Sequence, residues 1–481
     1  MQIVKYIIHQ ARLHEDEPAI GFAGGVVTYG LLAKGIESAV TKLRQLELPA
    51  RALVALHVSN PFHFLALQIA LWLLGQPTAP IFARAQIEFS GVTPLLTITD
   101  KPEFDLPGSR VIRLADDWFD VDPKAPANYQ ELLELPGFKP DDVNQVSFSS
   151  GTTGYPKAIS TKAGAFERAT FEGAMLQAGP HSHAVRCIGM TGAAASTGLS
   201  MYVLSQGGFI ALATQPDEVL RLIRVFDLEA LFGAVGQYQS LMSALGNAQP
   251  PRSLKSLVAF GSKIPKPLLR DIRARLCPNI NLMYSSTEAG IMAVGTGPLL
   301  EQHDGCVGYA VPGIKLEIVD ANHKPLPAGS DGLVRVKTPF QNYYVAPTPE
   351  TDAMFDDGWF FPGDVGCLET DGLISIRGRA SEVINRGGVI AAPEMIEDVM
   401  RTLPFVKDVA VFGVPDKDGL DRIWAAVVSD NWVDEGGTRQ VIAARLPDRT
   451  PDRIVQVDAI PRTDNGKIKR AELRAKYAAG V

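Results

Sequence analysis

Short apolar runs alternate with helix-length segments through most of this 481-residue chain, and this alternation constrains the fold more than any other feature. The apolar runs predict parallel strands, because strands covered by helices on both faces are apolar along most of their length. These runs are residues 52–58, 185–190, 209–214, 229–235 and 254–260. The intervening segments that predict helices are residues 62–74, 196–206, 217–226 and 237–245. Repeated strand and helix units predict an α/β fold with doubly wound sheets.

The pattern changes in the last third of the chain. Residues 314–320, 332–338 and 372–378 are short strand-like runs divided by Gly and Pro turns, which predicts an antiparallel β subdomain. After Arg379 a compact α+β pattern of about 100 residues follows, within the usual size range of a domain. The sequence therefore predicts a large N-terminal domain over residues 1–380 and a small C-terminal domain over residues 381–481.

Composition excludes several classes of function. A formal net charge of −7 provides no positive field for phosphate backbones, so nucleic acid is not an expected partner. The four cysteines, Cys187, Cys277, Cys306 and Cys367, lie far apart and form no C-x-x-C pair. This usage favours a reduced intracellular chain over a disulfide framework or a zinc site.

The sequence shows neither the pattern of a signal peptide nor a segment that could span a membrane. The first residues lack the small-residue cleavage site of a signal peptide. The longest apolar stretch, Phe64 to Gly75, is about 12 residues long and too short to cross a bilayer. We therefore expect a cytoplasmic protein with no membrane span.

A loop rich in glycine and hydroxyl groups, SFSSGTTGYPKAIS at residues 147–160, follows the predicted strand VNQVSFS. Backbone N–H groups in such a loop can converge on phosphate oxygens, and glycines let the backbone approach closely. The spacing differs from a Walker P-loop, and Ala158 follows Lys157 where a magnesium-binding hydroxyl would be needed. A solvated loop is the alternative interpretation of this segment alone.

The segment SSGTTGYPK resembles the signature loop of the adenylate-forming enzymes, which comprise acyl-CoA synthetases, nonribosomal peptide adenylation domains and beetle luciferases. The resemblance is closest in pattern to acyl-CoA synthetases. It implies that this loop binds the phosphates of ATP. The implied residues are Ser149, Ser150, Gly151, Thr152, Thr153, Gly154 and Lys157.

A second segment, MYSSTEAG at residues 283–290, resembles the Y-G-x-T-E segment of that family, with Ser285 where glycine is commoner. Tyr284 offers a flat face to a purine, Thr287 a hydroxyl to the α-phosphate, and Glu288 a hard oxygen ligand to Mg²⁺. The resemblance also implies nucleotide contacts from Gly261, Ser262, Ser285 and Ser286.

Two further segments resemble the family's ribose-binding and crossover segments. In GWFFPGDVG, Asp364 would accept hydrogen bonds from the ribose hydroxyls, although Pro362 replaces the usual threonine. In residues 376–397, Arg379 is implied near the ribose, and Ser381 is at the hinge, where Asp or Lys is commoner. The pair Gly387 and Gly388 resembles coenzyme A ligases and would let a pantetheine arm pass close to the backbone.

The segment PRTDNGKIKR at residues 461–470 resembles the family's catalytic-lysine segment and implies that Lys467 is catalytic, together with Thr287 and Glu288. A lysine on a loop can stabilise charge that develops between the substrate carboxylate and the α-phosphate. The resemblance further implies that the small domain rotates about the hinge between the two half-reactions.

The acyl pocket of the family corresponds to parts of residues 187–198, 233–239 and 259–265. No acid is present in the first segment, so an α-amino acid substrate is disfavoured. The implied pocket residues are Thr191, Gly192, Ala193, Ala194, Ala195, Gly236 and Gln237. A peripheral helix between Pro80 and Leu95 is expected to be shortened relative to the family.

The resemblance implies activation of a small carboxylic acid with ATP and Mg²⁺, followed by transfer of the acyl group to coenzyme A. An acyl or peptidyl carrier protein is the alternative thiol acceptor. A non-catalytic ATP- or AMP-binding protein is the alternative from another functional class, although Lys467 and Glu288 are both present. No feature supports a luciferase-like oxygenation.

Overall fold

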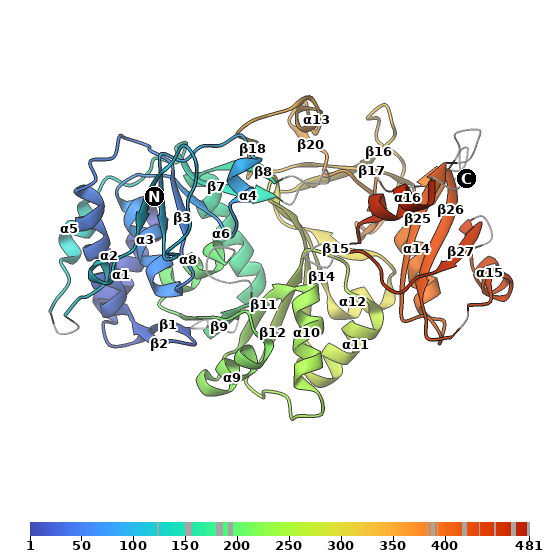
Figure 1. Cartoon of the computed structure of the whole chain (residues 1–481), viewed down its shortest axis with the longest axis horizontal. Helices are drawn as coiled ribbons and strands as arrows, with labels where there is room; N and C mark the ends of the chain where they lie inside the picture. Colours follow the sequence, from blue (N-terminus) through green and yellow to red (C-terminus); the bar gives the residue numbers. More distant parts are fainter. Residues whose placement is uncertain are drawn as a thin grey trace. The chain divides into compact units, whose positions relative to one another are not determined.

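The computed structural model places most of the chain in two compact units. It describes residues 1–122, 125–149, 156–178, 186–190, 196–380, 382, 384–385, 390–391, 393–415, 421–431, 433–446, 449–462 and 468–478. Unit 1 comprises residues 1–301, 310–315 and 337–360. Unit 2 comprises residues 302–309, 316–336 and 361–481. Figure 1 shows the chain from its N-terminus in blue to its C-terminus in red.

Unit 1 contains a largely parallel sheet in the order β14-β13-β12-β11-β9-β10-β1-β2. The strands from β13 to β1 in this order are parallel to one another, whereas β14 pairs antiparallel with β13 and β2 pairs antiparallel with β1. The strands are β1 (Pro18–Phe22), β2 (Gly25–Thr28), β9 (Arg186–Gly189), β10 (Phe209–Leu212), β11 (Ala230–Ala234), β12 (Ser256–Phe260), β13 (Ile280–Ser286) and β14 (Gly290–Thr296).

A second sheet of unit 1 has the order β18-β8-β7-β4-β3-β5-β6. Strand β3 lies between β4 and β5, which follow it in the chain on opposite sides, so the sheet is doubly wound at this point. The strands are β3 (Val54–His57), β4 (Thr78–Pro80), β5 (Leu96–Thr99), β6 (Arg110–Arg113), β7 (Val143–Ser149), β8 (Lys157–Lys162) and β18 (Tyr343–Tyr344). A short hairpin, β19 (Phe355–Asp356) and β20 (Trp359–Phe360), completes the strands of this unit.

Helices cover both sheets of unit 1. In Figure 1, α1, α2 and α3 lie together in blue, and α9, α10 and α11 lie along the green strands. The helices are α1 (Gln2–Leu13), α2 (Tyr29–Arg44), α3 (Pro61–Leu73), α4 (Ala85–Glu88), α5 (Tyr129–Glu134), α6 (Ala163–Ala178), α8 (Thr197–Ser205), α9 (Pro216–Phe226), α10 (Val235–Leu245), α11 (Lys266–Arg275), α12 (Gly297–Gln302) and α13 (Pro349–Asp352); a 3₁₀ turn, η1, spans Asp116–Trp118.

Local sequence explains why these helices begin and pack as they do. In α9, Pro216 occupies the first turn, where its missing N–H is not needed, and Val219, Leu222 and Ile223 form the buried face. In α3, Asn60 caps the N-terminus, and every residue from Phe64 to Leu73 is fully buried. The longest apolar run of the sequence is therefore a core helix. Within the described ranges, no helix is both long and apolar enough to cross a membrane.

Unit 2 combines an antiparallel β segment with a small α+β region. Strands β17, β21, β22 and β15 are neighbours in that order, and β16 pairs with β17. They are β15 (Cys306–Ala310), β16 (Lys315–Val319), β17 (Asp331–Lys337), β21 (Asp364–Leu368) and β22 (Ile374–Arg379). The remaining elements are β23 (Ile384–Asn385), β24 (Ile390–Ala391), α14 (Pro393–Arg401), β25 (Asp408–Pro415), β26 (Asp421–Val428), α15 (Glu435–Ala443), β27 (Arg453–Gln456) and α16 (Arg470–Ala478).

The sheet β25-β26-β27 is buried on both faces. Val409 and Val411 of β25 pack in a cluster with Ile396 of α14 and Ile442 of α15. The alternate residues of β25, among them Phe412, pack with Leu473 of α16 on the other face. Burial of both faces explains why this segment of the sequence is apolar without alternation.

The structure confirms the predicted α/β fold, with a large sheet-rich N-terminal part and a smaller α+β C-terminal part. The five apolar runs predicted as strands contain β3, β9, β10, β11 and β12. The connection between Pro80 and Leu95 holds a helix of one turn, α4. A domain boundary at residues 380 and 381 and a hinge at Ser381 remain predictions; Ser381 lies outside the described residues.

Candidate active site

The predicted phosphate loop is the tip of an antiparallel hairpin. Strands β7 and β8 pair in register up to Ser149 opposite Lys157, so the two described ends of the loop lie side by side. Both residues are half-buried. The predicted contacts between them, Ser150, Gly151, Thr152, Thr153 and Gly154, lie outside the described residues.

A second hairpin tip carries the predicted catalytic residues Thr287 and Glu288. Strands β13 and β14 pair antiparallel up to Ser286 opposite Gly290. Gly290 has a φ of +70°, in the left-handed region that glycine adopts without strain. The hydroxyl of Ser286 accepts a hydrogen bond from the N–H of Ala289 at 3.1 Å, which closes the turn. The sequence therefore places Glu288 at a defined bend.

Residues 338–345, which we call the bridging segment, contact both the hairpin of β7 and β8 and the hairpin of β13 and β14. Asn342 donates from Nδ2 to the carbonyl of Thr287 and from its N–H to the carbonyl of Glu288, each at 2.8 Å. Further along, β18 pairs with β8, so that Tyr344 lies opposite Ile159 and the N–H of Val345 donates to the carbonyl of Ala158 at 2.9 Å.

Tyr344 links the two hairpin tips through its side chain. Its hydroxyl donates to Oε1 of Glu288 at 2.5 Å, and the Lys157 ammonium lies 5.8 Å from the centre of its ring. Burial, with a further contribution from the bond to Glu288, raises the pKa of Tyr344 far above its usual value of 10, so the phenol stays protonated and acts as a donor. Sequence reasoning missed Asn342 and Tyr344.

The donor set at Glu288 fits Mg²⁺ bound together with a nucleotide. The side chain is nearly buried, and among the described residues its carboxylate is contacted by a neutral hydroxyl and by no cationic side chain. Mg²⁺ prefers oxygen ligands and is commonly held by one or two carboxylates plus substrate phosphates. Within the described residues, no cluster of three His, Cys, Asp or Glu side chains could hold a metal ion. A metal ion at Glu288 would therefore need the phosphates of the nucleotide as further ligands.

A further group of predicted nucleotide-binding residues lies at one edge of the parallel sheet. Strands β12 and β13 pair in parallel up to Phe260 opposite Met283, and Gly261 and Tyr284 follow directly. Gly261 has a φ of +88°, and the space where its Cβ would lie is open. Tyr284 is half-buried, whereas Ser262 and Ser285 are exposed.

The two predicted acyl-pocket residues that the structure describes, Gly236 and Gln237, follow β11 at the same edge. Gln237, in the first turn of α10 after β11, donates from Nε2 to the carbonyl of Met190, which follows β9, at 2.6 Å. Its Oε1 accepts from the N–H of Ala234 at 2.8 Å. Gly236 is exposed. The remaining predicted pocket residues, Thr191, Gly192, Ala193, Ala194 and Ala195, lie outside the described residues.

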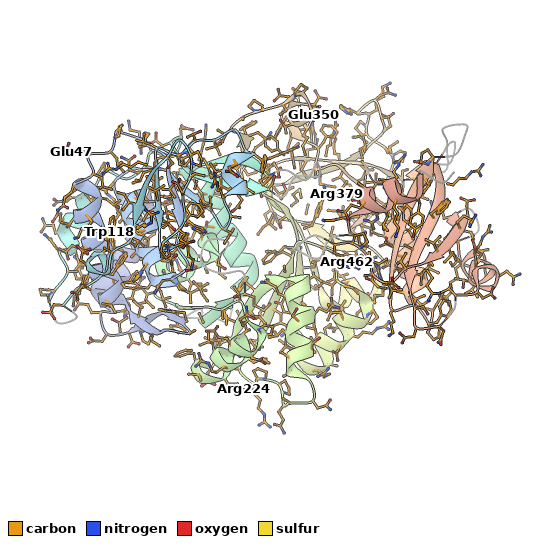
Figure 2. The ribbon with its side chains drawn as sticks, in the orientation of Figure 1. Glu47, Trp118, Arg224, Glu350, Arg379 and Arg462 are labelled. Atoms are coloured by element: carbon orange, nitrogen blue, oxygen red, sulfur yellow. The ribbon has the colours of Figure 1, made fainter. Side chains whose placement is uncertain are left out.

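In unit 2 the structure brings together the two residues predicted to bind ribose. Asp364 and Arg379 lie opposite each other on the antiparallel strands β21 and β22. Nη1 of Arg379 lies 3.2 Å from Oδ1 of Asp364 and donates to the carbonyl of Pro362 at 2.6 Å. Figure 2 labels Arg379 among the side chains of the chain. Asp364 is 6% exposed, whereas the Arg379 side chain is 39% exposed and accessible to a ligand.

The remaining predicted functional residues belong to segments that the structure does not describe: Ser381, Gly387, Gly388 and Lys467. The described residues on either side of the lysine segment are close together, because Arg462 and Ile468 form an isolated antiparallel bridge. Lys467 directly precedes this bridge in the chain.

Arg470, three residues after Lys467, lies in a cluster of three carboxylates, of which Glu397 is buried and Glu382 and Glu394 are partly exposed. Its guanidinium lies 2.5 Å from Glu382, 3.1 Å from Glu394 and 2.7 Å from Glu397, and its Nε donates to the carbonyl of Val411 at 3.0 Å. Burial, only partly offset by Arg470, raises the pKa of Glu394 to about 7, and the charges of Glu397 and Glu382 also contribute to this rise. The sequence pattern gave no role to these glutamates.

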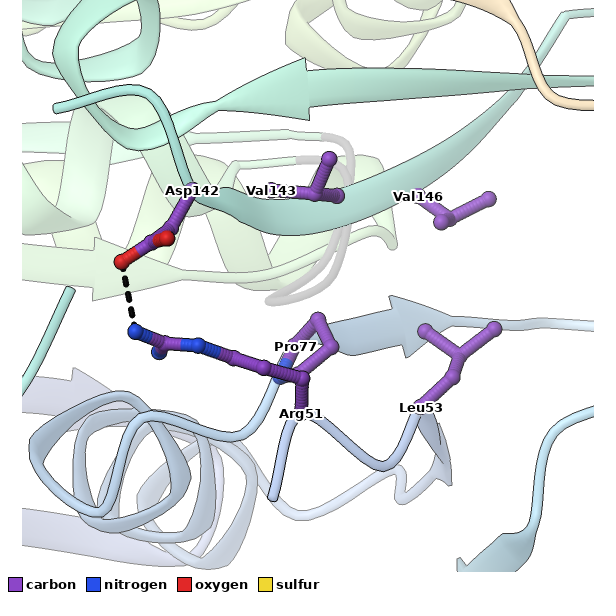
Figure 3. A pocket seen from close by; sticks show the side chains of 6 residues that line it. All are labelled: Arg51, Leu53, Pro77, Asp142, Val143 and Val146. Carbon is purple, nitrogen blue, oxygen red and sulfur yellow. Dashed lines mark hydrogen bonds and ion pairs between the residues drawn. The ribbon is translucent and has the colours of Figure 1, made fainter. Parts of the chain in front are cut away.

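A pocket of about 270 Å³ elsewhere in unit 1 contains none of the predicted site residues. Figure 3 shows its six lining residues and the ion pair of 2.5 Å between Arg51 and Asp142. The apolar part of its lining consists of Leu53, Pro77, Val143 and Val146. Val143 and Val146 belong to β7, so the pocket lies along the strand that leads to the phosphate loop.

Comparison with known protein families matches nearly the whole chain. Residues 7–344 match the family model of the AMP-binding enzymes, and residues 395–467 match the model of the AMP-binding enzyme C-terminal domain. Together these matches include every residue predicted to bind the nucleotide or to be catalytic, except Asp364 and Arg379, which lie between the two matched ranges.

Several curated proteins are similar in sequence. A medium-chain fatty-acid–CoA ligase of Escherichia coli is 28% identical over 69% of this chain, and the match spans 61% of that ligase. An indoleacetate–CoA ligase of Aromatoleum aromaticum is 25% identical over 99% of this chain and 98% of its own length. A fatty acid–acyl-carrier-protein ligase of Streptomyces coeruleorubidus is 30% identical over 47% of this chain and 45% of its own length.

Solved structures share the fold. The o-succinylbenzoate coenzyme A synthetase of Bacillus subtilis, in complex with ATP and magnesium ion, superposes with a TM-score of 0.83 at 20% identity, covering 98% of this chain and 99% of that one. An amide bond synthetase of Marinactinospora thermotolerans gives a TM-score of 0.81 at 23% identity, covering 99% of both chains. The family models and the shared fold agree with the motifs of the sequence: the chain belongs to the AMP-binding enzymes, the family of adenylate-forming ligases.

Proposed function

We propose that this protein activates a carboxylic acid with ATP and transfers the acyl group to the thiol of coenzyme A. In the first half-reaction a carboxylate oxygen attacks the α-phosphorus, the bond to the β-bridging oxygen breaks, and pyrophosphate leaves. In the second, a thiol sulfur loses its proton and attacks the acyl carbon, and AMP leaves. Both steps require positioning and charge stabilisation rather than a covalent enzyme intermediate.

One observation supports this proposal more than any other. The residues predicted for nucleotide and acid come from separate segments of the sequence, and four of these segments follow the adjacent parallel strands β9, β11, β12 and β13. Parallel strands present their carboxyl ends at one edge of a sheet, where ligands bind in open α/β folds. A common edge for these segments is what a reaction between ATP and an acid requires.

The proposed roles follow from the chemistry of each group. The loop ending at Lys157 would hold the β- and γ-phosphates, and Thr287 would donate to the α-phosphate. Asp364 and Arg379 would contact the ribose. Glu288 would hold Mg²⁺, which neutralises phosphate charge when it is bound. Lys467 would stabilise the transition state of adenylation.

The identity of the acceptor thiol is a separate part of the proposal. Gly387 and Gly388 resemble the paired glycines of coenzyme A ligases, and the indoleacetate–CoA ligase matches nearly the full length of this chain. Loading of a carrier-protein phosphopantetheine is the second candidate, favoured by the match to the acyl-carrier-protein ligase over about half of the chain.

Exchange of labelled pyrophosphate into ATP tests the first half-reaction. A panel of alkyl and aryl carboxylic acids is expected to support exchange, and free α-amino acids are expected to support less. The best acid is then incubated with coenzyme A or with a phosphopantetheinylated carrier protein, and thioester is measured by mass spectrometry. Absence of exchange with every acid would contradict the proposed function, and thioester on the carrier alone would reassign the acceptor.

A further inference from the structure

The predicted magnesium ligand is held by residues that lie about 50 or more positions further along the chain. Glu288 is at the tip of the hairpin formed by β13 and β14, and the bridging segment of residues 338–345 runs beside it. Thr338 donates from its hydroxyl to the carbonyl of Ala289 at 3.2 Å, and Asn342 makes its two bonds to the backbone of Thr287 and Glu288. The backbone of the tip is therefore fixed from outside its own hairpin.

Tyr344 fixes the side chain of the same glutamate. The backbone position of Tyr344 is set by its pairing with Ile159 in β8, two residues after Lys157. The phenol has two rotatable bonds before the ring plane is defined, so a strand-anchored tyrosine presents its hydroxyl at a narrow range of positions. That hydroxyl donates to Oε1 of Glu288.

The bond engages one oxygen of Glu288 without neutralising its charge. A tyrosine hydroxyl is a neutral donor, whereas a lysine or arginine in the same position would compete with a metal ion for the carboxylate. Among the described residues, Glu288 has no ion pair. Metal-ligating carboxylates are commonly held in this way by hydrogen bonds from outside the coordination sphere.

We propose that Tyr344 is a positioning residue for magnesium: its hydroxyl orients the carboxylate of Glu288 so that Mg²⁺ binds with the phosphates of ATP. This inference rests on the proposed function, because it assigns Glu288 as the metal ligand. Asn342 supports the same geometry through the backbone. Tyr344 is not assigned any contact with the acid, the acyl group or the thiol.

The hydrogen bond from Tyr344 to Glu288 would also be present if Tyr344 had the opposite role, that of keeping Mg²⁺ away from Glu288. A hydroxyl that covers Glu288 in the absence of the metal would have to be displaced before Mg²⁺ binds, and it would weaken binding rather than strengthen it. The two roles predict opposite signs for the effect of removing the hydroxyl, so one substitution separates them.

The experiment compares Tyr344→Phe with Tyr343→Phe. Tyr343 is the neighbouring residue of β18, its side chain is 53% exposed, and its contact with Phe355 is a ring contact that phenylalanine retains. The affinity for Mg²⁺ is measured by calorimetry in the presence of a saturating non-hydrolysable ATP analogue, and Mn²⁺ binding is measured by electron paramagnetic resonance. Thermal unfolding of both variants controls for a change in folding.

Tyr344→Phe is expected to weaken Mg²⁺ and Mn²⁺ binding by about 10- to 100-fold, the range found when such supporting hydrogen bonds are removed. Tyr343→Phe is expected to match the wild-type protein. In a Glu288→Gln background, Tyr344→Phe should cause no further loss, because the group that it positions is no longer a carboxylate.

Unchanged or tighter metal binding by Tyr344→Phe would overturn the inference. If the wild-type protein bound the ATP analogue without any effect of Mg²⁺, the assignment of Glu288 would fail, and the inference would fail with it. If the wild-type protein showed Mg²⁺-dependent binding and Tyr344→Phe retained it in full, only the role of Tyr344 would be wrong.

Discussion

Two buried glutamates in this protein differ in whether a cationic side chain is paired with their carboxylates. Glu288 in unit 1 receives a hydrogen bond from a neutral tyrosine, and no described cationic side chain pairs with it. Glu397 in unit 2 is equally buried, but its two oxygens contact Arg470, Arg401 and the N–H of Val411. The first carboxylate keeps its charge for a ligand, whereas the second is already satisfied by the protein.

We propose that this difference separates a binding site at Glu288 from a structural site at Glu397. A buried charge is costly unless it is paired, so a buried carboxylate without a cationic partner among the described residues is a candidate for compensation by a bound cation. Burial by itself does not distinguish the two sites, because Glu288 and Glu397 are both less than 10% exposed. The charge of the neighbouring donors does distinguish them.

The largest expected effect concerns the available carboxylate. Glu288→Gln keeps an oxygen that can accept the bond from Tyr344 but removes the charge that Mg²⁺ needs. We expect pyrophosphate exchange to fall by about 100-fold or more, on the scale of losing one preorganised electrostatic group, with little change in thermal unfolding. Glu397→Gln is the matched variant, and it should lower stability instead. Equal effects of both substitutions on exchange would remove the distinction between the two sites.

A second test concerns the predicted catalytic lysine, Lys467. Lys467→Ala is expected to slow adenylation by about 100-fold, because the proposed transition state loses a charge-assisted contact. The variant should still convert a supplied acyl-adenylate to thioester, since the lysine is assigned to the first half-reaction only. Both half-reactions are measured separately, and normal pyrophosphate exchange would remove Lys467 from the catalytic residues.

The sequence predicted most of the fold because its signals are local. Residues 216–226 have a first-turn proline and a periodic apolar face, and both features lie within the helix that they specify. The same holds for the glycine and hydroxyl residues around the phosphate loop. Such patterns need no knowledge of which segments meet in space.

The parts that sequence reasoning missed depend on long-range pairing. Tyr344 lies 56 residues from Glu288, and only the register of β18 on β8 brings them together. Nothing in the letters QNYY indicates that pairing. Arg470 is likewise part of a recognised motif, but its three glutamate partners lie 73 to 88 residues away, and no local pattern indicates that they meet.

A third test perturbs the satisfied site. Arg470→Met leaves Glu382, Glu394 and Glu397 without their shared guanidinium, and breaking a buried pair in this way typically costs about 3–5 kcal/mol. Arg474→Met, one turn further along α16, removes a half-exposed arginine paired with Asp421 and should cost less than about 1 kcal/mol. Urea unfolding followed by circular dichroism measures both. A loss of stability in Arg470→Met no larger than that in Arg474→Met would show that the cluster is not a structural site.

The smallest expected effect is the pH dependence of the same cluster. Burial raises the pKa of Glu394 to about 7 in the folded protein, above the usual value of 4.5, so folding favours the protonated form. The contribution of this group to stability is therefore fully present below pH 4.5 and is lost as the pH rises toward 7. The slope from this one group is at most about 1.4 kcal/mol per pH unit.

Glu394→Gln mimics the protonated side chain and should remove this part of the slope. The free energy of unfolding is measured by urea denaturation at several pH values between 5 and 7.5 for the wild-type protein and the variant. We expect the variant to gain stability relative to the wild-type protein as the pH rises through this range, because the wild-type carboxyl group must ionise beside Glu382 and Glu397 while a glutamine does not. Arg470 limits the gain, since its guanidinium lies 3.1 Å from Glu394 and favours the ionised form. Parallel curves for the two proteins would mean that Glu394 titrates equally in the folded and unfolded chains, which would contradict the raised pKa of this group.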